Sequence, residues 1–210
     1  MHQFTANGEP IENVQDFNFL GSYITNHGGS SKEIKRRIGM ARSAMFDTGN
    51  IWKSHDISRY TKLRLVKALI FSIATYGCES WTMTQNDRTR ITSFEIWTYG
   101  RILQVEWRDR KTNVYILTEM KHPQSLVNCI EKRKMEYFGH LCRRDGDNLE
   151  NLIMEGRTEG RRGRGRPRAR WIDTIKSATG RSASHLKQLT LDRQHWKNEI
   201  AGVTTGRHTT

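Results

Sequence analysis

Hydrophobic positions recur at helical spacing along most of the chain. The first stripe repeats at spacings of four, three and four residues: Ile34, Ile38, Ala41 and Met45. Such a stripe marks the buried face of an amphipathic helix, which we expect over residues 32–48. Ser30 or Ser31 is placed to accept hydrogen bonds from the free N–H groups of the first turn. Gly49 is placed to end the helix, because glycine readily adopts the left-handed conformation found beyond helix C-termini.

The same period predicts further helices along the chain. Their expected bounds are Asp56 or Ser58 to Thr75, Thr84 or Asp87 through Ile102, Val114 to Met120 after Thr112, and Pro123 to about Arg143. Their inward positions are Leu63, Val66, Leu69, Ile70, Ile73, Ile91, Phe94, Trp97, Ile102, Leu126, Ile130, Met135, Phe138 and Leu141. The wide stripe of the second helix predicts a central position for it. Helical spacing returns at Trp171-Ile172-Ile175, Leu186-Leu189 and Trp196-Ile200.

The first thirty residues have a different pattern, typical of short strands. Asn7-Gly8 is a hairpin turn signal, because both residues tolerate positive φ. Phe17 and Phe19 share one face of a strand by alternation. We therefore predict a mostly α fold with an N-terminal β-hairpin, a helical bundle, an Arg/Gly-rich linker and a small C-terminal helical region. The expected divisions are residues 1–30, 31–110, 111–155, 156–170 and 171–210.

The net charge of the chain indicates the kind of partner that it binds. The formal net charge is +13 and the isoelectric point about 10.0, so the chain attracts polyanions. Residues 1–30 hold no Lys or Arg, whereas residues 157–170 hold seven Arg and one acid. Nucleic acid is the expected polyanion, as an RNA–DNA hybrid or a DNA duplex, and an anionic membrane surface is the rival. No apolar run reaches the length of a spanning helix, and no signal peptide begins the chain.

Cysteine usage predicts an intracellular setting, nuclear or cytoplasmic. The three cysteines are too few and too scattered for a disulfide framework. A reducing compartment is therefore expected. The oligomeric state is not predicted by any pattern in the sequence.

The most specific local signal is Arg164-Gly165-Arg166-Pro167, which resembles the core of an AT-hook. In that motif the backbone lies in a narrow A·T minor groove and both arginines enter its negative potential. Gly163 replaces the usual proline before it. Generic phosphate contact by a cationic linker is the alternative, and a linker that contacts nothing is a third. The candidate nucleic-acid-binding residues are Lys35, Arg36, Arg37, Arg161, Arg162, Arg164, Arg166, Arg168 and Arg170.

Catalytic and metal signals are weak. Asp145 and Asp147 form the one close carboxylate pair, in a turn better explained by solvation than by metal binding. His140 and Cys142 are weak zinc candidates, because no Cys-x-x-Cys accompanies them. We therefore expect no catalytic residues, no bound metal or other cofactor, no small-molecule substrate, and no enzymatic activity of the chain on its own.

The segment Phe17-Asn18-Phe19-Leu20-Gly21-Ser22-Tyr23-Ile24 resembles the Phe-x-Tyr-Leu-Gly segment of non-LTR retrotransposon reverse transcriptases. Further stretches are similar to RTE-like elements, namely residues 34–45, 61–81, 102–112, 131–144 and 156–171. The resemblance implies that Phe17, Phe19, Leu20 and Gly21 form a primer-grip-like hairpin. It also implies that residues 31–110 form a thumb-like bundle and that the remainder is the element's C-terminal region. Asn18 stands where the family often has a basic residue.

The resemblance also implies what this chain lacks. The family's Ala-Asp-Asp motif has no counterpart here, so Mg²⁺ would be used only by the complete polymerase. The expected function is that of a fragment which binds template and primer without catalysing. The alternative is a host-recruited, non-enzymatic module that binds another protein. Since the palm is absent, Phe17, Phe19 and Tyr23 should leave an exposed apolar patch.

Overall fold

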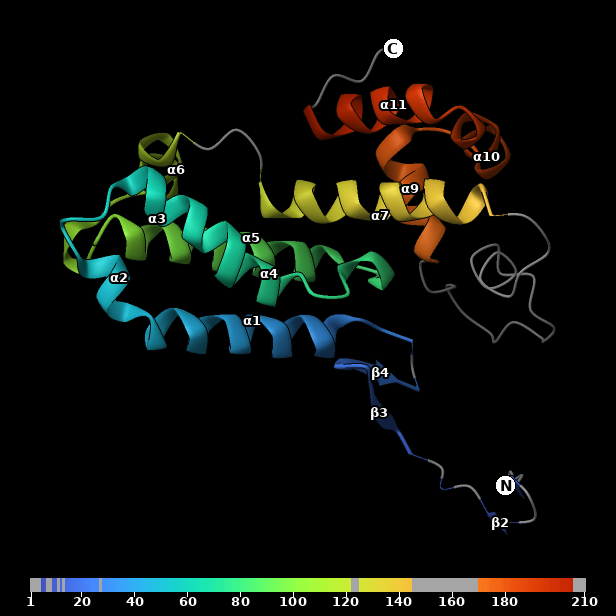
Figure 1. Cartoon of the computed structure of the whole chain (residues 1–210), viewed down its shortest axis with the longest axis horizontal. Coiled ribbons are helices and arrows are strands. Elements are labelled where there is room, and N and C mark those ends of the chain that lie inside the picture. The colour runs from blue at the N-terminus through green and yellow to red at the C-terminus, as the bar shows by residue number, and fades with distance from the viewer. Residues whose placement is uncertain are drawn as a thin grey trace.

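The computed structural model describes residues 5–6, 9–10, 12, 14–26, 28–121, 125–144 and 170–205. It confirms a mostly α fold with a β-hairpin near the N-terminus (Figure 1). The strands are β1 (Thr5–Ala6), β2 (Glu9–Pro10), β3 (Asp16–Phe19) and β4 (Ser22–Thr25). The α-helices are α1 (Ser31–Asp47), α2 (Gly49–Lys53), α3 (Arg59–Leu65), α4 (Phe71–Ala74), α5 (Gln85–Ile102), α6 (Asn113–Met120), α7 (Leu126–Cys142), α9 (Trp171–Thr179), α10 (Ala183–Leu191) and α11 (Arg193–Thr205). The short helical elements are the π-helix η1 (Val66–Ile70) and the 3-10 turns η2 (Cys78–Ser80) and η3 (Trp107–Asp109).

The strands form two antiparallel pairs. β1 pairs with β2 on either side of Asn7-Gly8, as the turn signal predicts. β3 pairs with β4 across a two-residue turn, Leu20-Gly21, in which both residues have positive φ, 47° and 77°. Two positive φ angles in succession define the type I′ turn, whose twist matches that of the flanking strands. Phe17 faces Ile24 in this register, so one face of the hairpin is apolar.

The predicted apolar patch of Phe17, Phe19 and Tyr23 is wrong in one member, Tyr23. Phe17 and Phe19 are exposed, as expected, with exposed fractions of 55% and 53%. Tyr23, however, pairs with Asn18 and lies on the opposite face, where its ring lies 4.9 Å from Lys32 Nζ. Side chains alternate between the faces of a strand, so Tyr23 cannot share a face with Phe17. Ile24 takes its place in the patch.

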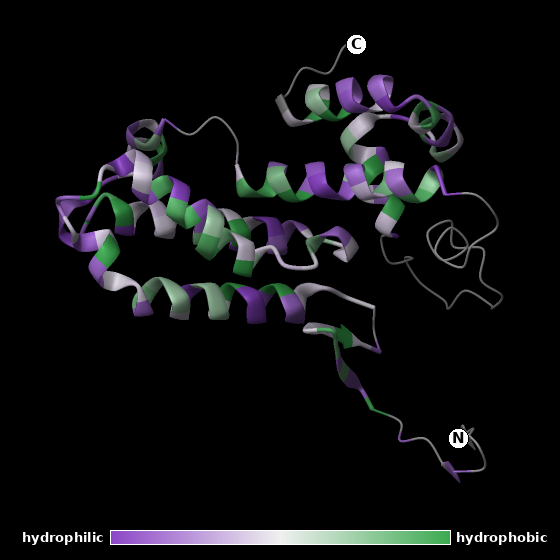
Figure 2. Cartoon of the chain, viewed as in Figure 1, coloured by the Kyte–Doolittle hydropathy of each residue, from purple (hydrophilic) through white to green (hydrophobic). Residues whose placement is uncertain are grey.

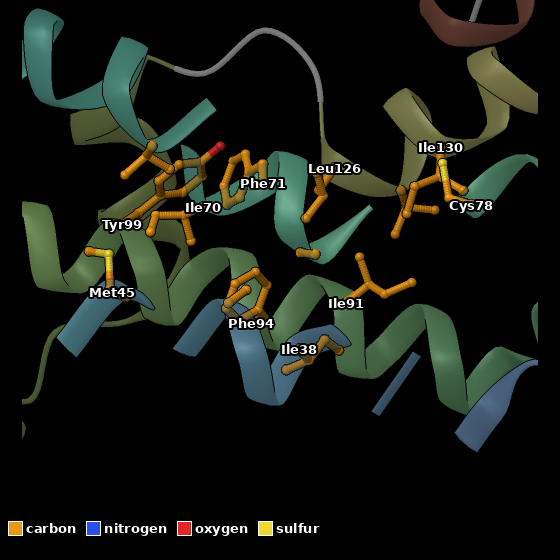
Figure 3. Packing of buried hydrophobic residues seen from close by; sticks show 14 of the residues in the cluster. Ile38, Met45, Ile70, Phe71, Cys78, Ile91, Phe94, Tyr99, Leu126 and Ile130 are labelled. Atoms are coloured by element: carbon orange, nitrogen blue, oxygen red, sulfur yellow. The ribbon is translucent and has the colours of Figure 1, made fainter. Parts of the chain in front are cut away.

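The first core lies among α1, α3, η1, α4 and α5. Its buried members include Ile34, Ala41, Val66, Phe71, Phe94 and Tyr99. Figure 3 shows Phe71 and Phe94 pointing toward each other, and their ring centroids are 6.2 Å apart. The aromatic pair is edge-to-face, the arrangement that the ring quadrupoles favour.

The second predicted helix is present, and most of its predicted stripe is inward: Val66 and Ile70 are buried, and Leu63 and Ile73 pack against the first core. The chain is helical from Arg59 to Ala74, with a π-turn inserted at Val66–Ile70. A π-turn adds one residue to the turn and so rotates the positions that follow. Leu69, predicted to be inward, is consequently 45% exposed, whereas Phe71 and Ala74 are buried.

Helix termini are mostly where the cap signals predict them. Thr84 and Asp87 form a reciprocal capping box at the start of α5, and Thr112 caps α6. Ser125 caps α7, so this helix begins at Leu126 rather than at Pro123, which lies outside the described residues.

The termini of α1 differ from the prediction in chemistry. Ser30 is the N-cap residue, but its hydroxyl accepts from the N–H of Thr82 at 3.0 Å and caps nothing in α1. Ser31 donates to Asp87 of α5 at 2.7 Å instead. Gly49 does not follow α1 as a simple stop; it begins α2. The hydroxyl groups of Ser30 and Ser31 therefore bond to residues distant in the sequence instead of capping α1.

Helix α7 contributes to two hydrophobic cores. Its first half supplies Leu126, Val127 and Ile130 to the first core, and its second half supplies Met135, Phe138 and Leu141 to a second core. The second core is completed from α9, α10 and α11 by Ile172, Ile175, Leu186, Trp196 and Ile200. Figure 1 shows α7 between the bundle that contains α1–α5 and the C-terminal helices. Hydrophilic and hydrophobic stretches alternate along it (Figure 2).

No helix in the described part of the chain is long and apolar enough to cross a membrane.

Candidate nucleic-acid interface

The turn of the β3–β4 hairpin is attached to α1 and to the turn that follows α4. The carbonyl oxygen of Gly21 accepts from Arg36 Nη2 at 2.6 Å and also from Arg37 Nη2. The carbonyl oxygen of Leu20 accepts from the Tyr76 hydroxyl at 3.1 Å. The Arg37 guanidinium lies over the Tyr76 ring, 4.3 Å from its centroid. The structure therefore brings together two groups of predicted site residues, the hairpin turn and the arginines of α1.

A buried carboxylate holds these two arginines. Glu33 Oε2 accepts from Arg36 Nε and Oε1 accepts from Arg37 Nε, both at 2.7 Å. The N–H of Tyr23 donates to the same carboxylate at 3.2 Å. Burial would raise the pKa of Glu33, but the hydrogen bonds from Arg36 and Arg37 outweigh it and the pKa is lowered. Arg37 is buried and Arg36 half-buried, so both contribute mainly to fixing the hairpin on α1.

The third predicted cation of α1, Lys35, lies on an exposed stripe of the helix. Spacings of seven and four residues place Arg42 and Phe46 on the same stripe. Helix α5 presents a matching stripe of Arg90, Trp97 and Arg101. The α1/α5 face is the surface formed by these six residues: Lys35, Arg42, Phe46, Arg90, Trp97 and Arg101.

The centre of the α1/α5 face is a stack of arginines and aromatic rings. The guanidinium of Arg101 lies 4.7 Å from the ring centroid of Phe46 and 5.4 Å from that of Trp97. The guanidinium of Arg42 lies 5.3 Å from the Trp97 centroid. The two rings are themselves in contact edge-to-face, with centroids 5.7 Å apart. Trp97 also stacks on the fully buried Phe94, which anchors the stack to the first core.

The face carries uncompensated positive charge. Arg90 is paired with Asp87 at 3.0 Å. Within the described part of the chain, Lys35, Arg42 and Arg101 have no ion pair. Aromatic rings flanked by free cations suit nucleic acid, because bases stack on the rings and phosphates pair with the cations.

The remaining predicted site residues lie apart from this face. Arg170 is exposed and bonds to Asp173 at the start of α9. Arg161, Arg162, Arg164, Arg166 and Arg168 lie outside the described residues. Helix α9 begins at Trp171, where the sequence predicts that helical structure resumes. Trp171 Nε1 donates to the carbonyl oxygen of Glu79 at 2.7 Å, which ties α9 to η2.

The two weak metal candidates are near the end of α7. His140 is exposed and lines a groove beside α11, and Cys142 packs against the second core. Burial raises the pKa of the Cys142 thiol, which disfavours the thiolate that zinc requires. Within the ranges that the structure describes, no three His, Cys, Asp or Glu side chains gather as a metal site would need.

Four residues of the α1/α5 face were not predicted as site residues: Arg42, Phe46, Trp97 and Arg101. A signal was present, because Arg42 and Phe46 are four residues apart, as are Trp97 and Arg101. An arginine four residues from an aromatic lies beside it on a helix. The packing of α1 against α5, which joins the two pairs, is not visible in the sequence.

Comparison with known proteins indicates the origin of the chain. No family model matches the chain. No solved structure matches it either. The chain is similar to a transposon-derived protein of Caenorhabditis elegans. The two are 27% identical over 209 residues, covering 93% of this chain and 73% of that protein. This similarity supports a transposon origin for the chain.

Proposed function

We propose that the chain is a nucleic-acid-binding part of a non-LTR retrotransposon reverse transcriptase that lacks the polymerase active site. In the complete protein it would contribute to holding the template and primer. The hairpin motif at Phe17–Ile24 supports this assignment, and the transposon-derived relative agrees with it. On its own the chain would bind nucleic acid without extending a primer.

The observation that carries the proposal is the α1/α5 face. Arg42 and Arg101, which have no ion pair among the described residues, lie against the partly exposed rings of Phe46 and Trp97 on adjacent helices. Lys35 adds a third such cation on the same stripe of α1. Lys and Arg side chains that neutralise phosphates release condensed counterions, and this release drives binding. The rings add a stacking contribution that depends little on base identity. We therefore expect binding to an RNA–DNA hybrid and to a DNA duplex, with modest preference between sequences.

The test is a fluorescence-anisotropy titration of a labelled RNA–DNA hybrid and a DNA duplex of one sequence, at several salt concentrations. Replacing Arg42 and Arg101 with Gln removes two cations. The slope of log K against log salt should become shallower by about 2, and affinity at low salt should fall roughly tenfold or more. The same mixtures supplied with nucleotides and Mg²⁺ should show no primer extension.

The matched control replaces Arg59 and Arg64 with Gln, which removes the same charge from exposed positions of α3. This variant should bind like the parent. Equal losses in both variants would mean that net charge, and not this face, determines binding. Primer extension by the pure parent chain would contradict the non-catalytic part of the proposal.

The hairpin favours a second candidate, a host-recruited protein-interaction module. Phe17, Phe19 and Ile24 are each more than half exposed on one face of the hairpin. An exposed apolar patch of this kind is typical of a surface that binds another protein. The same titration separates the two candidates, because a parent chain that binds neither duplex at low salt would leave only this one.

A further inference from the structure

A groove runs between α7 and α11 on the C-terminal side of the molecule. The two helices are antiparallel: Asn128 near the start of α7 donates to the carbonyl oxygen of Thr204 at the end of α11 at 3.4 Å, and Trp196 near the start of α11 donates to that of Met135 at 3.0 Å. They approach closely at Gly139, because Trp196 lies against it and donates to the Met135 carbonyl oxygen at 3.0 Å. The groove between them has a volume of about 780 Å³.

The walls of this groove are predominantly basic. The α7/α11 groove is lined by Lys132, Glu136, His140, Arg143, Arg193, Trp196, Lys197, Ile200, Ala201 and Thr204. Glu136 is the single acid in this lining, and its Oε1 lies 3.9 Å from Lys132 Nζ. The apolar members, chiefly Trp196 and Ile200, are buried and belong to the second core. The groove therefore has an apolar floor and cationic rims.

Among the described residues that line the groove, Glu136 is the one acid, so most of the positive charge there is not balanced. Arg143 donates to the Thr190 carbonyl oxygen, a neutral partner, and no acid in the described part of the chain pairs with it. Among the residues that the structure describes, Arg193 and Lys197 have no acidic partner. Cations gathered along a concave surface focus the electrostatic potential there and attract anions.

We propose that the α7/α11 groove binds the phosphate backbone of a nucleic acid, as a second contact surface separate from the α1/α5 face. The cations extend along α7 from Lys132 to Arg143, about 16 Å at 1.5 Å per residue. One strand of a duplex carries a phosphate roughly every 3.4 Å along its axis, so this length matches about five phosphates. A small anion would use only part of such a row. Backbone contacts of this kind position a duplex without reading its sequence.

The position of the groove makes it independent of the first surface. Helices α1 and α11 lie on opposite sides of α7 in Figure 1. The groove is built from the second core, whereas the α1/α5 face rests on the first. Losing one surface should therefore leave the other in place, and the two can be tested separately in the full chain.

The experiment compares the parent with a variant in which Arg193 and Lys197 are replaced by Gln. Both side chains are exposed, so the fold should be retained, as circular dichroism would confirm. In the duplex titration the slope of log K against log salt should become shallower by about 2. The affinity at low salt should fall roughly tenfold or more. The variant Arg193→Lys with Lys197→Arg keeps both charges and should bind like the parent.

Three results would overturn the proposal. The first is a Gln variant with the parent's slope and affinity. The second is a loss of equal size in the charge-preserving variant, since that would indicate a packing effect. The third is groove-dependent binding to vesicles containing anionic lipid, with none to duplexes, which would assign the groove to a membrane surface. A loss confined to the Arg42 and Arg101 variant would reject the groove while leaving the proposed function standing.

Discussion

Lys134 is a buried cation at the junction of the two cores. Its Nζ donates to the carbonyl oxygen of Trp81 at 2.6 Å and to the Thr174 hydroxyl at 2.8 Å. It thereby links α7 to α9 and to the residue that follows η2. Burial, helped by the nearby Arg88 guanidinium, lowers the pKa of Lys134 from 10.5 to about 8, while Glu131 opposes the shift. The junction is therefore sensitive to pH in a range that solution experiments reach.

Replacing Lys134 with Met should remove a defined pH dependence of stability. Below pH 8 the lysine is protonated in both the folded and unfolded states, and its contribution is constant. Between pH 8 and 9 the folded state loses this proton while the unfolded state keeps it, so unfolding takes up a proton. The parent's free energy of unfolding should therefore rise relative to the variant's by about 1 kcal/mol over this interval.

Urea unfolding of both proteins at pH 7, 8 and 9 measures this difference. The pKa of Cys78, raised by burial to about 11, affects parent and variant alike and largely cancels. Parallel stability curves for the two proteins would show that the folded Lys134 titrates near its ordinary value.

At the scale of elements, close helix approach depends on glycine at one position. A Cβ atom at Gly139 would lie 2.3 Å from Trp196 Nε1 and 2.6 Å from its Cδ1. The tryptophan ring is 2% exposed and its N–H is committed to the Met135 carbonyl oxygen, so it cannot easily move. Gly139 thus sets the distance between α7 and α11, and with it the shape of the groove.

Replacing Gly139 with Ala should destabilise the chain by about 1–3 kcal/mol, because overpacking a buried contact forces the helices apart. Thermal unfolding followed by circular dichroism measures the change. The control is Gly39→Ala in α1, where a Cβ would meet nothing within 4 Å. There the lower backbone entropy of the unfolded chain should stabilise by roughly 0.5–1 kcal/mol. Stabilisation by both substitutions would refute the tight α7/α11 contact.

The β3–β4 hairpin shows how an element can be fixed by its polar face alone. Its contacts with α1 are made by Gly21, Tyr23 and Asp16, whose carboxylate pairs with Lys32. Its apolar face remains exposed. The Arg36, Arg37 and Glu33 network therefore orients the hairpin, and packing on α1 leaves the aromatic side available to a partner.

At the scale of the whole molecule, α7 joins the two cores into one unit. Three buried residues of this helix belong to each core. A helix forms cooperatively, so loss of structure in one half should weaken the other. The Trp171 bond to η2 and the Lys134 bonds add further links across the junction.

A cavity in the second core should therefore reduce the stability of the first. Leu186 is fully buried in α10, and Leu186→Ala should cost about 2–5 kcal/mol. Hydrogen exchange should show lower protection in α1 and α5 as well as in α10. Leu191→Ala removes the same atoms from a position of α10 that is 69% exposed and should change nothing. Unchanged protection in α1 with Leu186→Ala would show that the cores unfold independently.

The sequence by itself determined the hairpin and most of the helices, because their signals are local; α2 was not predicted. The spacing of Ile34 to Met45 defines α1, and the alternation of Phe17 and Phe19 defines the exposed face of the hairpin. Helix α9 begins at Trp171 as the return of helical spacing predicts. The prediction that Leu69 is inward was wrong, because a π-turn rotates the positions that follow it without changing the apolar composition.

Only the tertiary structure decided what each cation does. Arg36 and Arg37 are adjacent to Lys35 and chemically alike, yet the buried Glu33 and the hairpin turn hold the two arginines while Lys35 remains exposed. The α1/α5 face and the α7/α11 groove likewise unite residues separated by about fifty positions or more. Local sequence patterns determine which face of its own helix a side chain occupies. Which helix packs beside it depends on burial of the whole apolar surface, which only the assembled fold determines.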